Sequence, residues 1–478
     1  MIELYTPISR IQPKTALEVH TSRLGVGFEK LDRQAFDPEK AYDKVASIGA
    51  KWVRIQSGWQ RTETVPGIYD FSWLDRVVDN LRARGMWPWI CLCYGNPLYS
   101  EAAKEIFGSV GVVPMYTAEE QTAWKNYVVA LTKHFQGRVH YYEIWNEPDN
   151  GHCWRRGVNG TEFGHFTAET AKHIRQGDPD AKIIGGAIMS LGHMDFIEEA
   201  LQAGMAQAVN AISFHSYNAR QTFESELKSN VERLKSLCQT YNPKLEIVQG
   251  EGGVQSRGDG CGALRGQAFN QRRQAKMLLR QQISFLKHHV VFSSYFSAMD
   301  MMEALNGRNG DVSSYKDYGY FGVIGAEFDE MGRSSGEYKP KESYYALQNL
   351  CSVFAEEWEL TDRLPAVPSP TYSPRIAGEE LPLSSMDYVG FRKPDGSSAL
   401  AYWALTAPLT TEYDGSMSFV TEEKPENVGF ADLLTGKLYR VPETNIQKTE
   451  DGKYRILNIP MADHPFLLTF GDFCTSGG

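Results

Sequence analysis

The feature that most constrains the fold of this chain is a regular alternation of short apolar runs with amphipathic stretches. In these stretches apolar residues recur at the spacing of a helix, as Leu227, Val231 and Leu234 do. The eight apolar runs are residues 24–28, 51–56, 87–94, 140–145, 182–187, 211–216, 245–250 and 290–297. A strand followed by a helix, eight times over, predicts the α/β class and a (β/α)8 TIM barrel. No Gly-x-Gly-x-x-Gly string follows the first run, which argues against a doubly wound dinucleotide-binding sheet.

Towards the C-terminus the hydrophobic period changes to two residues, which is typical of strands. Apolar and polar residues alternate between Gly, Pro and Asp turns in residues 399–405, 428–433, 437–441 and 454–459. These segments predict an all-β sandwich. We therefore expect an N-terminal extension at residues 1–20, a catalytic barrel at 21–358 and a β-sandwich accessory domain at 359–478. The accessory domain is expected to brace the barrel.

Charge and composition narrow the class of partner. The chain has 49 Lys and Arg against 59 Asp and Glu, a net charge of −10, which disfavours nucleic acid and anionic membranes. No apolar run reaches the roughly 20 residues of a membrane span, and the first residues show no signal-peptide pattern. The seven scattered cysteines fit free thiols and a cytoplasmic location. Aromatic residues, at 12%, suit either a cleft for a flat ligand such as a sugar or an aromatic core.

Two glutamates stand at the ends of predicted strands, where a barrel of this kind places its catalytic groups. Glu147 follows the fourth run in Trp-Asn-Glu-Pro, and Glu251 follows the seventh in Gly-Glu-Gly-Gly. Proline stops the first of these strands and glycines permit a tight turn after the second, so both side chains should project into one cleft. The next carboxylate in the seventh run, Glu246, lies on the opposite face by the period of two.

A pair of carboxylates is the chemical requirement for splitting an acetal. One carboxyl group protonates the leaving oxygen while the other, ionised, attacks the anomeric carbon. A separation of about 5 to 5.5 Å between the two groups indicates a retaining mechanism. The sequence therefore predicts glycoside chemistry at Glu147 and Glu251.

The string Tyr-Glu-Ile-Trp-Asn-Glu-Pro at residues 142–148 resembles the acid/base motif of the retaining glycoside hydrolases of clan A. Within the clan the nearest resemblance is to glycoside hydrolase family 39, the group of β-xylosidases and α-L-iduronidases. Gly-Phe-Glu at residues 27–29 and the appended β-domain support it. The resemblance implies a (β/α)8 barrel in which Glu147 is the general acid/base and Glu251 the nucleophile.

The resemblance also implies roles for neighbouring residues. Asn146 would bind the sugar 2-hydroxyl, and Arg54 would keep the nucleophile ionised. His215 and Tyr217 would orient the nucleophile, although His215 also fits a buried core position. Further candidates for substrate binding, from strand ends and their loops, are Glu29, Trp59, Trp154 and Tyr295.

Arginines gather in the loops of the predicted active face. They are Arg61, Arg155, Arg156, Arg220 and Arg257. They fit either an anionic sugar such as a uronate or salt bridges with neighbouring acidic residues. The long segment 297–341, placed over the barrel mouth, favours a pocket and exo-action.

These observations predict a retaining exo-glycosidase that hydrolyses a β-glycoside, or the equivalent L-sugar glycoside, by double displacement. We expect no cofactor and no metal site, because no second His or Cys pair accompanies His152 and Cys153. The expected partner is an oligosaccharide or a small glycoside, with neither nucleic acid nor a membrane, and a homo-oligomer is left open. Two alternatives remain: a transglycosylase of the same fold, in which a sugar hydroxyl replaces water, and a non-catalytic glycan-binding barrel.

Overall fold

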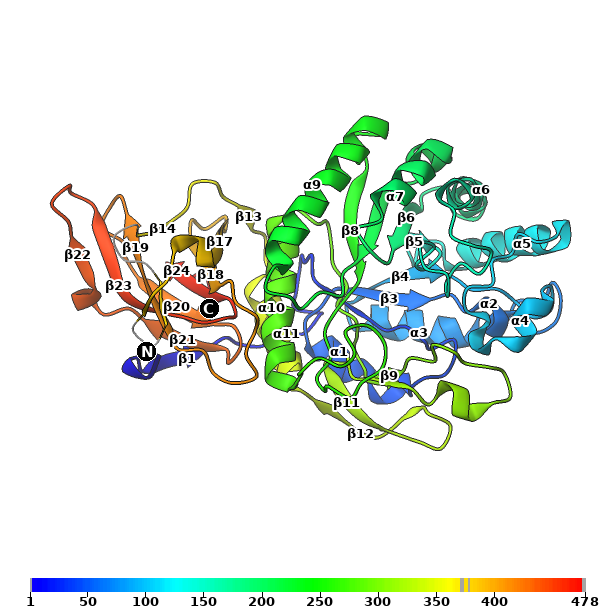
Figure 1. Ribbon diagram of the computed structural model, residues 1–478, viewed down its shortest axis with the longest axis horizontal. Helices are drawn as coiled ribbons and strands as arrows, with labels where there is room; N and C mark the ends of the chain where they lie inside the picture. The colour runs from blue at the N-terminus through cyan, green and yellow to red at the C-terminus, as the bar shows by residue number, and fades with distance from the viewer. Residues whose placement is uncertain (1, 370–373, 377–378, 475–478) are drawn as a thin grey trace.

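The computed structural model shows a barrel of parallel strands beside two antiparallel sheets (Figure 1). It describes residues 2–369, 374–376 and 379–474. Seven parallel strands pair in chain order, as in a (β/α)8 barrel. They are β2 (Gly25–Gly27), β3 (Trp52–Gln56), β4 (Trp87–Leu92), β5 (Tyr141–Ile144), β6 (Lys182–Ile188), β7 (Ala211–His215) and β8 (Glu246–Glu251). The predicted fold class is confirmed.

The eighth predicted strand, residues 290–297, differs from the prediction because it forms no regular strand. Its backbone makes two isolated parallel bridges, from Ser293 to Gln249 of β8 and from Tyr295 to Val26 of β2. These bridges close the barrel between its last and first strands. Because β2 is three residues long, it offers little backbone for a longer ladder.

Helices cover the outside of the barrel. Three of the four longest begin at side chains that cap them, as where the Thr117 hydroxyl accepts from the Glu120 amide in a capping box. The helices are α1 (Tyr42–Ser47), α2 (Trp59–Thr62), α3 (Ser72–Ala83), α4 (Glu101–Glu105), α5 (Ala118–Phe135), α6 (Gly160–Gly177), α7 (Met194–Ala200), α8 (Ala206–Ala208), α9 (Phe223–Tyr241), α10 (Gln271–Lys287) and α11 (Glu342–Val353). None of the helices that the structure describes combines the length and apolar character that a bilayer crossing requires.

Between the barrel closure and α11 the chain forms two hairpins, where the sequence predicted one long loop. Strand β9 (Met301–Met302) pairs with β10 (Tyr318–Gly319), and β11 (Ile324–Phe328) pairs with β12 (Ser334–Pro340). The first hairpin brings Glu303 to the barrel mouth.

The C-terminal strands form two antiparallel sheets that enclose a second core. The larger sheet has the order β1-β21-β20-β24-β18-β17-β13, and the smaller β16-β15-β19-β23-β22, with β14 also paired to β19. Their bounds are β1 (Pro7–Arg10), β13 (Glu359–Leu360), β14 (Val367–Pro368), β15 (Arg375–Ile376), β16 (Glu379–Glu380), β17 (Met386–Arg392), β18 (Ser398–Ala404), β19 (Gly415–Thr421), β20 (Val428–Asp432), β21 (Lys437–Arg440), β22 (Ile446–Lys448), β23 (Tyr454–Met461) and β24 (Phe466–Phe470). Tyr402, Phe419, Phe430 and Ile456 belong to the core between the sheets, so the predicted β-sandwich is confirmed.

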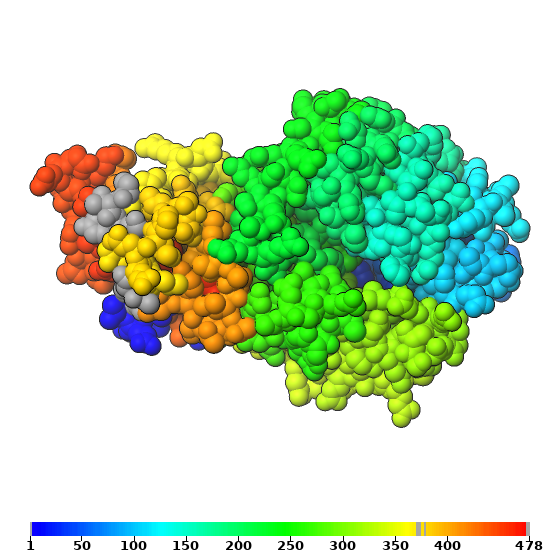
Figure 2. All heavy atoms as spheres, viewed as in Figure 1, coloured from blue at the N-terminus to red at the C-terminus, as the bar shows by residue number. Residues whose placement is uncertain are grey.

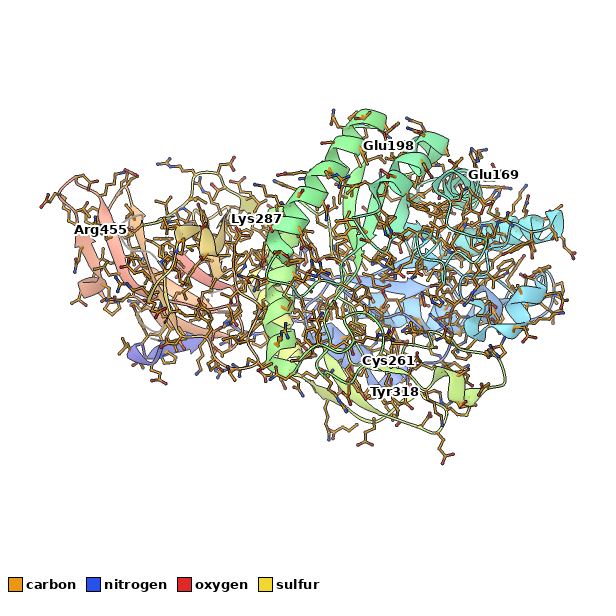
Figure 3. All side chains as sticks on the ribbon, in the orientation of Figure 1. Glu169, Glu198, Cys261, Lys287, Tyr318 and Arg455 are labelled. Carbon is orange, nitrogen blue, oxygen red and sulfur yellow. The ribbon has the colours of Figure 1, made fainter. Side chains whose placement is uncertain are left out.

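The boundaries of the three predicted parts stay a prediction. Strand β1 lies in the predicted N-terminal extension yet pairs with β21, so that extension contributes a strand to the larger C-terminal sheet. The barrel and the sheets also share α10, which lies between them with α11 (Figure 1). Residues 274–286 of α10 are all buried. Lys287, at its end, forms an ion pair with Asp387 of β17 (Figure 3).

Candidate active site

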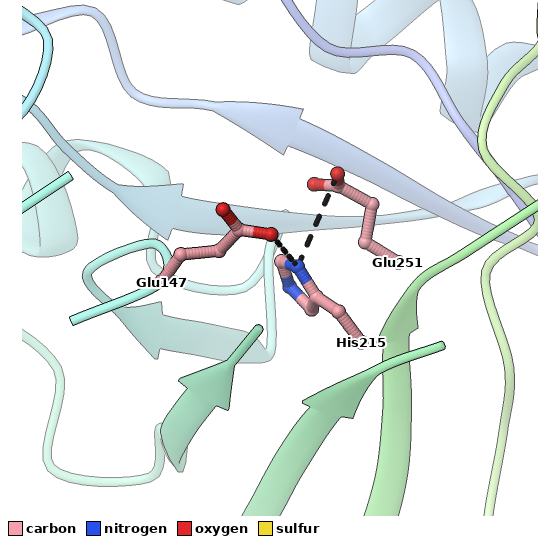
Figure 4. A group of neighbouring side chains, drawn as sticks. All are labelled: Glu147, His215 and Glu251. Atoms are coloured by element: carbon pink, nitrogen blue, oxygen red, sulfur yellow. Dashed lines mark hydrogen bonds and ion pairs between the residues drawn. The ribbon is translucent and has the colours of Figure 1, made fainter. Parts of the chain in front are cut away.

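Glu147 and Glu251 point toward one another at the carboxyl ends of β5 and β8, with His215 between them (Figure 4). Nδ1 of His215 lies 2.9 Å from Oε1 of Glu147 and 3.9 Å from Oε1 of Glu251. A carboxylate oxygen of Glu147 lies within 4.8 Å of one of Glu251. This spacing suits a retaining pair and is shorter than the roughly 6.5 to 9.5 Å of an inverting pair. Glu246, at the other end of β8, is exposed.

The turn after β5 aims Glu147 with a strained backbone. Trp145 and Glu147 have φ values of 68° and 47°, in the left-handed region that non-glycine residues rarely adopt. The amide of Glu147 donates to the carbonyl of Ala187 at 2.9 Å, and the indole of Trp145 donates to the carbonyl of Cys153 at 2.7 Å. These contacts offset the local strain and fix the direction of the Glu147 side chain.

Arg54 of β3 is the centre of a buried network beneath the two glutamates. Its guanidinium donates to Oε2 of Glu143 at 2.8 and 2.6 Å, to Oε2 of Glu251 at 2.8 Å and to Oδ1 of Asn146 at 2.8 Å. Burial by itself lowers the pKa of Arg54, but the carboxylates of Glu143, Glu251 and Glu29 raise it well above its ordinary value. Arg54 is therefore a permanent cation beside Glu251, the residue that the sequence analysis expected it to keep ionised. Its contact with Asn146 was not predicted.

The surroundings of Glu251 favour its ionised form. Burial raises the pKa of its carboxyl group, but the charges of His215 and Arg54 and a hydrogen bond from the hydroxyl of Tyr217 lower it below the ordinary value. For His215, burial lowers the pKa of the imidazole, and the carboxylates of Glu251 and Glu147 raise it above its ordinary value. An ionised carboxylate is the form that a nucleophile requires.

Glu147 has different partners from Glu251. Nδ2 of Asn150 donates to its Oε2 at 2.9 Å, and Sγ of Cys153 lies 3.8 Å from the same oxygen. Among the ion pairs of the described residues, none joins Glu147 to a lysine or arginine. Two carboxylates in such unlike surroundings suit two roles, and the one without a permanent cation suits the proton donor. Asn150 was not predicted; the turn string Pro-Asp-Asn-Gly after Glu147 was its one signal.

A second pair of acidic residues flanks Glu251. Glu29, 1% exposed, lies 3.4 Å from Nη1 of Arg54 and faces the buried network, where the sequence predicted substrate contact. Burial raises the pKa of Glu29 to about 7. Nζ of Lys30 lies 3.3 Å from Oε2 of Glu303, and the buried Oε1 of Glu303 has no partner among the described residues. Lys30, missed by the sequence analysis, directly follows a strand-end residue that was predicted.

The raised pKa of Glu29 predicts a pH-dependent stability. The protonated form is favoured by folding, so its stabilisation is complete below the unfolded pKa of 4.5 and is lost as the pH rises through about 7. In wild type, the free energy of unfolding should therefore fall by up to about 3 kcal/mol between pH 5 and 8. We expect this fall to be absent in Glu29→Gln. Denaturant unfolding at several pH values checks this, with exposed Glu246→Gln as the matched control. Equal pH slopes for wild type and Glu29→Gln would contradict it.

A cavity of about 580 Å³ opens over these residues, and Figure 2 shows the face of the molecule hollowed between the green and yellow-green segments. Its walls include Glu147, His215, Tyr217, Glu251 and Glu303. This volume falls in the range of small-molecule sites. The cavity therefore receives four residues from the ends of three strands, β5, β7 and β8, and one from the β9–β10 hairpin.

Three predicted aromatic residues do not reach this cavity. Trp59, Trp154 and Tyr295 are 1%, 0% and 0% exposed. The indole of Trp59 donates to Glu63 at 2.6 Å, that of Trp154 donates to Glu162 at 3.1 Å, and the Tyr295 hydroxyl donates to a backbone carbonyl. Because their polar atoms are satisfied inside the core and their rings are covered, they offer no surface for a sugar. Asn146, at 6% exposed, lies at the edge of the network.

The loop arginines have partners within the protein. The ion pairs are Arg156–Glu162, Arg220–Glu226 and Arg257–Asp259. Arg61 and Arg155 donate to backbone carbonyls. Of these five residues, Arg220 alone is among the described residues that line the cavity. The salt-bridge interpretation therefore fits them better than an anionic sugar.

The described residues contain one group of carboxylate and imidazole atoms close enough to hold a metal ion, and it is Glu147, His215 and Glu251. These atoms already have partners. Nδ1 of His215 contacts Glu147, while Arg54 and Tyr217 each bind one oxygen of Glu251. The arrangement fits proton transfer and nucleophilic attack by the side chains themselves.

Comparisons with known proteins give a family match over part of the chain and a fold over nearly all of it. The family model of glycosyl hydrolases family 39 matches residues 41–243, a range that includes Glu147 and His215 and ends before Glu251. No curated protein matches the chain.

Solved structures resemble the chain over nearly its whole length. The GH39 enzyme from Xanthomonas axonopodis pv. citri has a TM-score of 0.58 at 16% identity, over 96% of this chain and 98% of that chain. A monomeric β-xylosidase from Caulobacter crescentus CB15 has a TM-score of 0.58 at 14% identity, over 97% and 98%. A family 51 α-L-arabinofuranosidase from Bifidobacterium longum has 0.53 at 12%, over 98% and 97%. At these identities the likeness is one of fold.

The barrel, its paired carboxylates and the family match together define a retaining glycoside hydrolase. The predicted resemblance to glycoside hydrolase family 39 is confirmed over residues 41–243, the segment that carries the Trp-Asn-Glu-Pro string.

Proposed function

We propose that the protein is an exo-acting retaining glycosidase for a neutral β-glycoside, or the equivalent L-sugar glycoside, with Glu251 as nucleophile and Glu147 as general acid/base. The observation that carries the proposal is the pair of facing carboxylates at the base of the cavity, within 4.8 Å of one another and with Arg54 bound to only one of them. Arg54 thus keeps Glu251 anionic, and Glu147, which has no lysine or arginine partner among the described residues, is assigned the role of proton donor.

The two steps follow from this asymmetry. First, the carboxyl group of Glu147 protonates the leaving oxygen while the carboxylate of Glu251 attacks the anomeric carbon; the glycosidic C–O bond breaks and a glycosyl ester of Glu251 forms. Then the Glu147 carboxylate takes a proton from water, whose oxygen attacks the same carbon and releases Glu251. Two inversions give net retention.

The neighbouring residues support both steps. Arg54 and Tyr217 hold the two oxygens of Glu251, which fixes the direction of attack. The carbonyl oxygen of the Asn146 side chain is bound by Arg54, and its amide nitrogen, 4.0 Å from Sγ of Cys153, has a second N–H to donate to a sugar hydroxyl. His215 lies between the two glutamates and separates their charges.

The charge of the cavity favours a neutral sugar. Its walls carry Glu147, Glu226, Glu251 and Glu303, against Arg220 and His215. Lys30, the cation nearest Glu303, is already paired with it. A uronate carboxylate would meet repulsion here, whereas the hydroxyls of a neutral sugar can donate to the carboxylates of the walls.

Release of chromophore from activated aryl glycosides tests the proposal. The panel is β-xyloside, β-glucoside, β-galactoside, α-L-arabinosides, β-glucuronide and α-L-iduronide, with the β-xyloside first because one structural neighbour is a β-xylosidase. We expect turnover of at least one neutral glycoside, little or none of the two uronides, and a first-formed sugar that NMR shows to have the substrate's anomeric configuration.

The alternatives give different results in the same panel. Products in which the sugar is transferred to an added sugar acceptor, with little free sugar, would show a transglycosylase. Binding without release for every glycoside would show a glycan-binding barrel. Preferred turnover of a uronide would overturn the neutral-sugar assignment, and an inverted product would overturn the roles of the two glutamates.

A further inference from the structure

We propose that Trp403, in the larger C-terminal sheet, is a positioning residue for catalysis. Through Glu224 it holds the loop of residues 216–222, which carries Tyr217 against Glu251. This inference rests on the proposed role of Glu251 as nucleophile. It gives the C-terminal sheets a part in the chemistry that goes beyond bracing the barrel.

The buried carboxylate of Glu224 connects three elements, β18, α9 and α10. Nε1 of Trp403, in β18, donates to Oε1 of Glu224 at 2.9 Å. Glu224 is the second residue of α9, and it also accepts two hydrogen bonds from Arg280 of α10, at 2.7 and 2.8 Å. All three side chains are buried. A buried charge of this kind costs free energy unless every partner is in place, so the three elements are fixed relative to one another.

The same elements, α10 and the segment that includes β18, also hold the loop between β7 and α9 through further hydrogen bonds. Nε2 of Gln281, in α10, donates to the carbonyl of Asn218 at 3.0 Å. Nε2 of Gln221 donates to the carbonyl of Leu405, just after β18, at 3.1 Å. The loop is thus tied to α10 at one point and to the C-terminal sheet at another, while Glu224 fixes the start of the helix that follows.

The loop also contacts Glu251, the proposed nucleophile. The hydroxyl of Tyr217 donates to Oε1 of Glu251, and the amide of Ser216 donates to the carbonyl of Glu251 at 2.8 Å. Asn218 and Arg220 line the cavity. A shift of the loop therefore lengthens a hydrogen bond to the nucleophile and moves one wall of the cavity, and small displacements of this kind lower rates strongly.

Trp403→Phe tests the inference, because it keeps an aromatic ring and removes the N–H donor. The smaller ring also loses packing, and a second Trp→Phe substitution controls for that loss. We expect kcat on the best substrate to fall about tenfold with a smaller change in KM. We also expect the acid limb of kcat/KM against pH to move to higher pH, since Glu251 loses part of the hydrogen bond that lowers its pKa. A purely structural role would leave that limb in place.

A double-mutant cycle with Tyr217→Phe sharpens the test. If Trp403 acts through Tyr217, Trp403→Phe shifts the acid limb in the wild-type background and not in the Tyr217→Phe background. Equal shifts in both backgrounds would overturn the proposal.

Trp358→Phe is the matched control. Its ring packs against Phe354 of α11 and Phe391 of β17, at the same junction between barrel and sheets. We expect its kcat and acid limb to match those of wild type. Should Trp403→Phe fail to fold, Gln281→Leu, of similar size, removes the donor to the Asn218 carbonyl and should give the same shift.

A folded variant with a wild-type acid limb and kcat, for either substitution, would overturn the positioning role. The proposed function fails differently: wild type would then release no sugar from any glycoside, a result obtained before any variant is made.

Discussion

Replacing Glu251 by alanine should abolish glycoside hydrolysis, with kcat falling by at least about 10⁴-fold. The side chain supplies the nucleophile, and the neighbouring carboxylates cannot replace it, because Glu29 is buried against Arg54 and Glu303 is paired with Lys30. Removal of the carboxylate also leaves the positive charge of Arg54 beside a gap large enough for a small anion. Azide should therefore restore turnover and give a glycosyl azide of inverted anomeric configuration, which NMR identifies.

Glu246→Ala is the control for this prediction, because Glu246 begins the same strand and is exposed at its far end. It should leave kcat unchanged. Hydrolysis that survives in Glu251→Ala and disappears in Glu246→Ala would reverse the assignment.

The effect of Glu147→Ala should depend on the leaving group. For a glycoside whose aglycone is an alcohol or a second sugar, kcat/KM should fall by about 10² to 10⁴, since the leaving oxygen then departs without a proton. For a dinitrophenyl glycoside, whose leaving group needs no proton, the loss in the first step should be small. Across a series of aryl glycosides, kcat/KM should depend more steeply on the pKa of the leaving group in Glu147→Ala than in wild type. The alkaline limb of kcat/KM should also disappear.

Azide again distinguishes the roles. In Glu147→Ala it attacks the glycosyl ester of Glu251 from the face that water uses, so the glycosyl azide should keep the substrate's configuration. Glu162→Ala is the control, because Glu162 follows the same strand but binds Trp154 and Arg156 away from the two catalytic glutamates. An equal loss for every leaving group in Glu147→Ala would contradict the acid/base role.

The order of the strands explains why the central residues could be predicted from sequence. Each of Arg54, Glu147, His215 and Glu251 lies in or directly after an apolar run, and parallel strands bring such positions to one end of a barrel. Their chemistry then followed from residue type. The eighth run was predicted as a strand on its apolar content, but the closure of the barrel has only one bridge to β8 and one to β2.

Contacts between distant parts of the chain explain the rest. Trp59 has the residue type and the position after a strand that suit stacking on a sugar ring. In the structure Tyr99 and Tyr127 stack on it, and Glu63 accepts a hydrogen bond from its indole. The residues next to Trp59 in the sequence give no sign that other side chains bury its ring. The pair of Lys30 and Glu303 likewise joins the first strand to a hairpin after the last, a contact that strand periodicity does not encode.

The burial of α10 on every face has a consequence for the modular character of the chain. In enzymes whose accessory domain is joined to the catalytic domain by a flexible linker, either domain can be exchanged or deleted. Here Lys276, in the middle of α10, forms an ion pair with Asp463 in which neither side chain is exposed. Deleting the C-terminal sheets would leave that charge without its counter-ion and expose one side of the helix to water. The barrel and the sheets therefore form one structural unit. A chimera with a related protein would have to exchange both parts together.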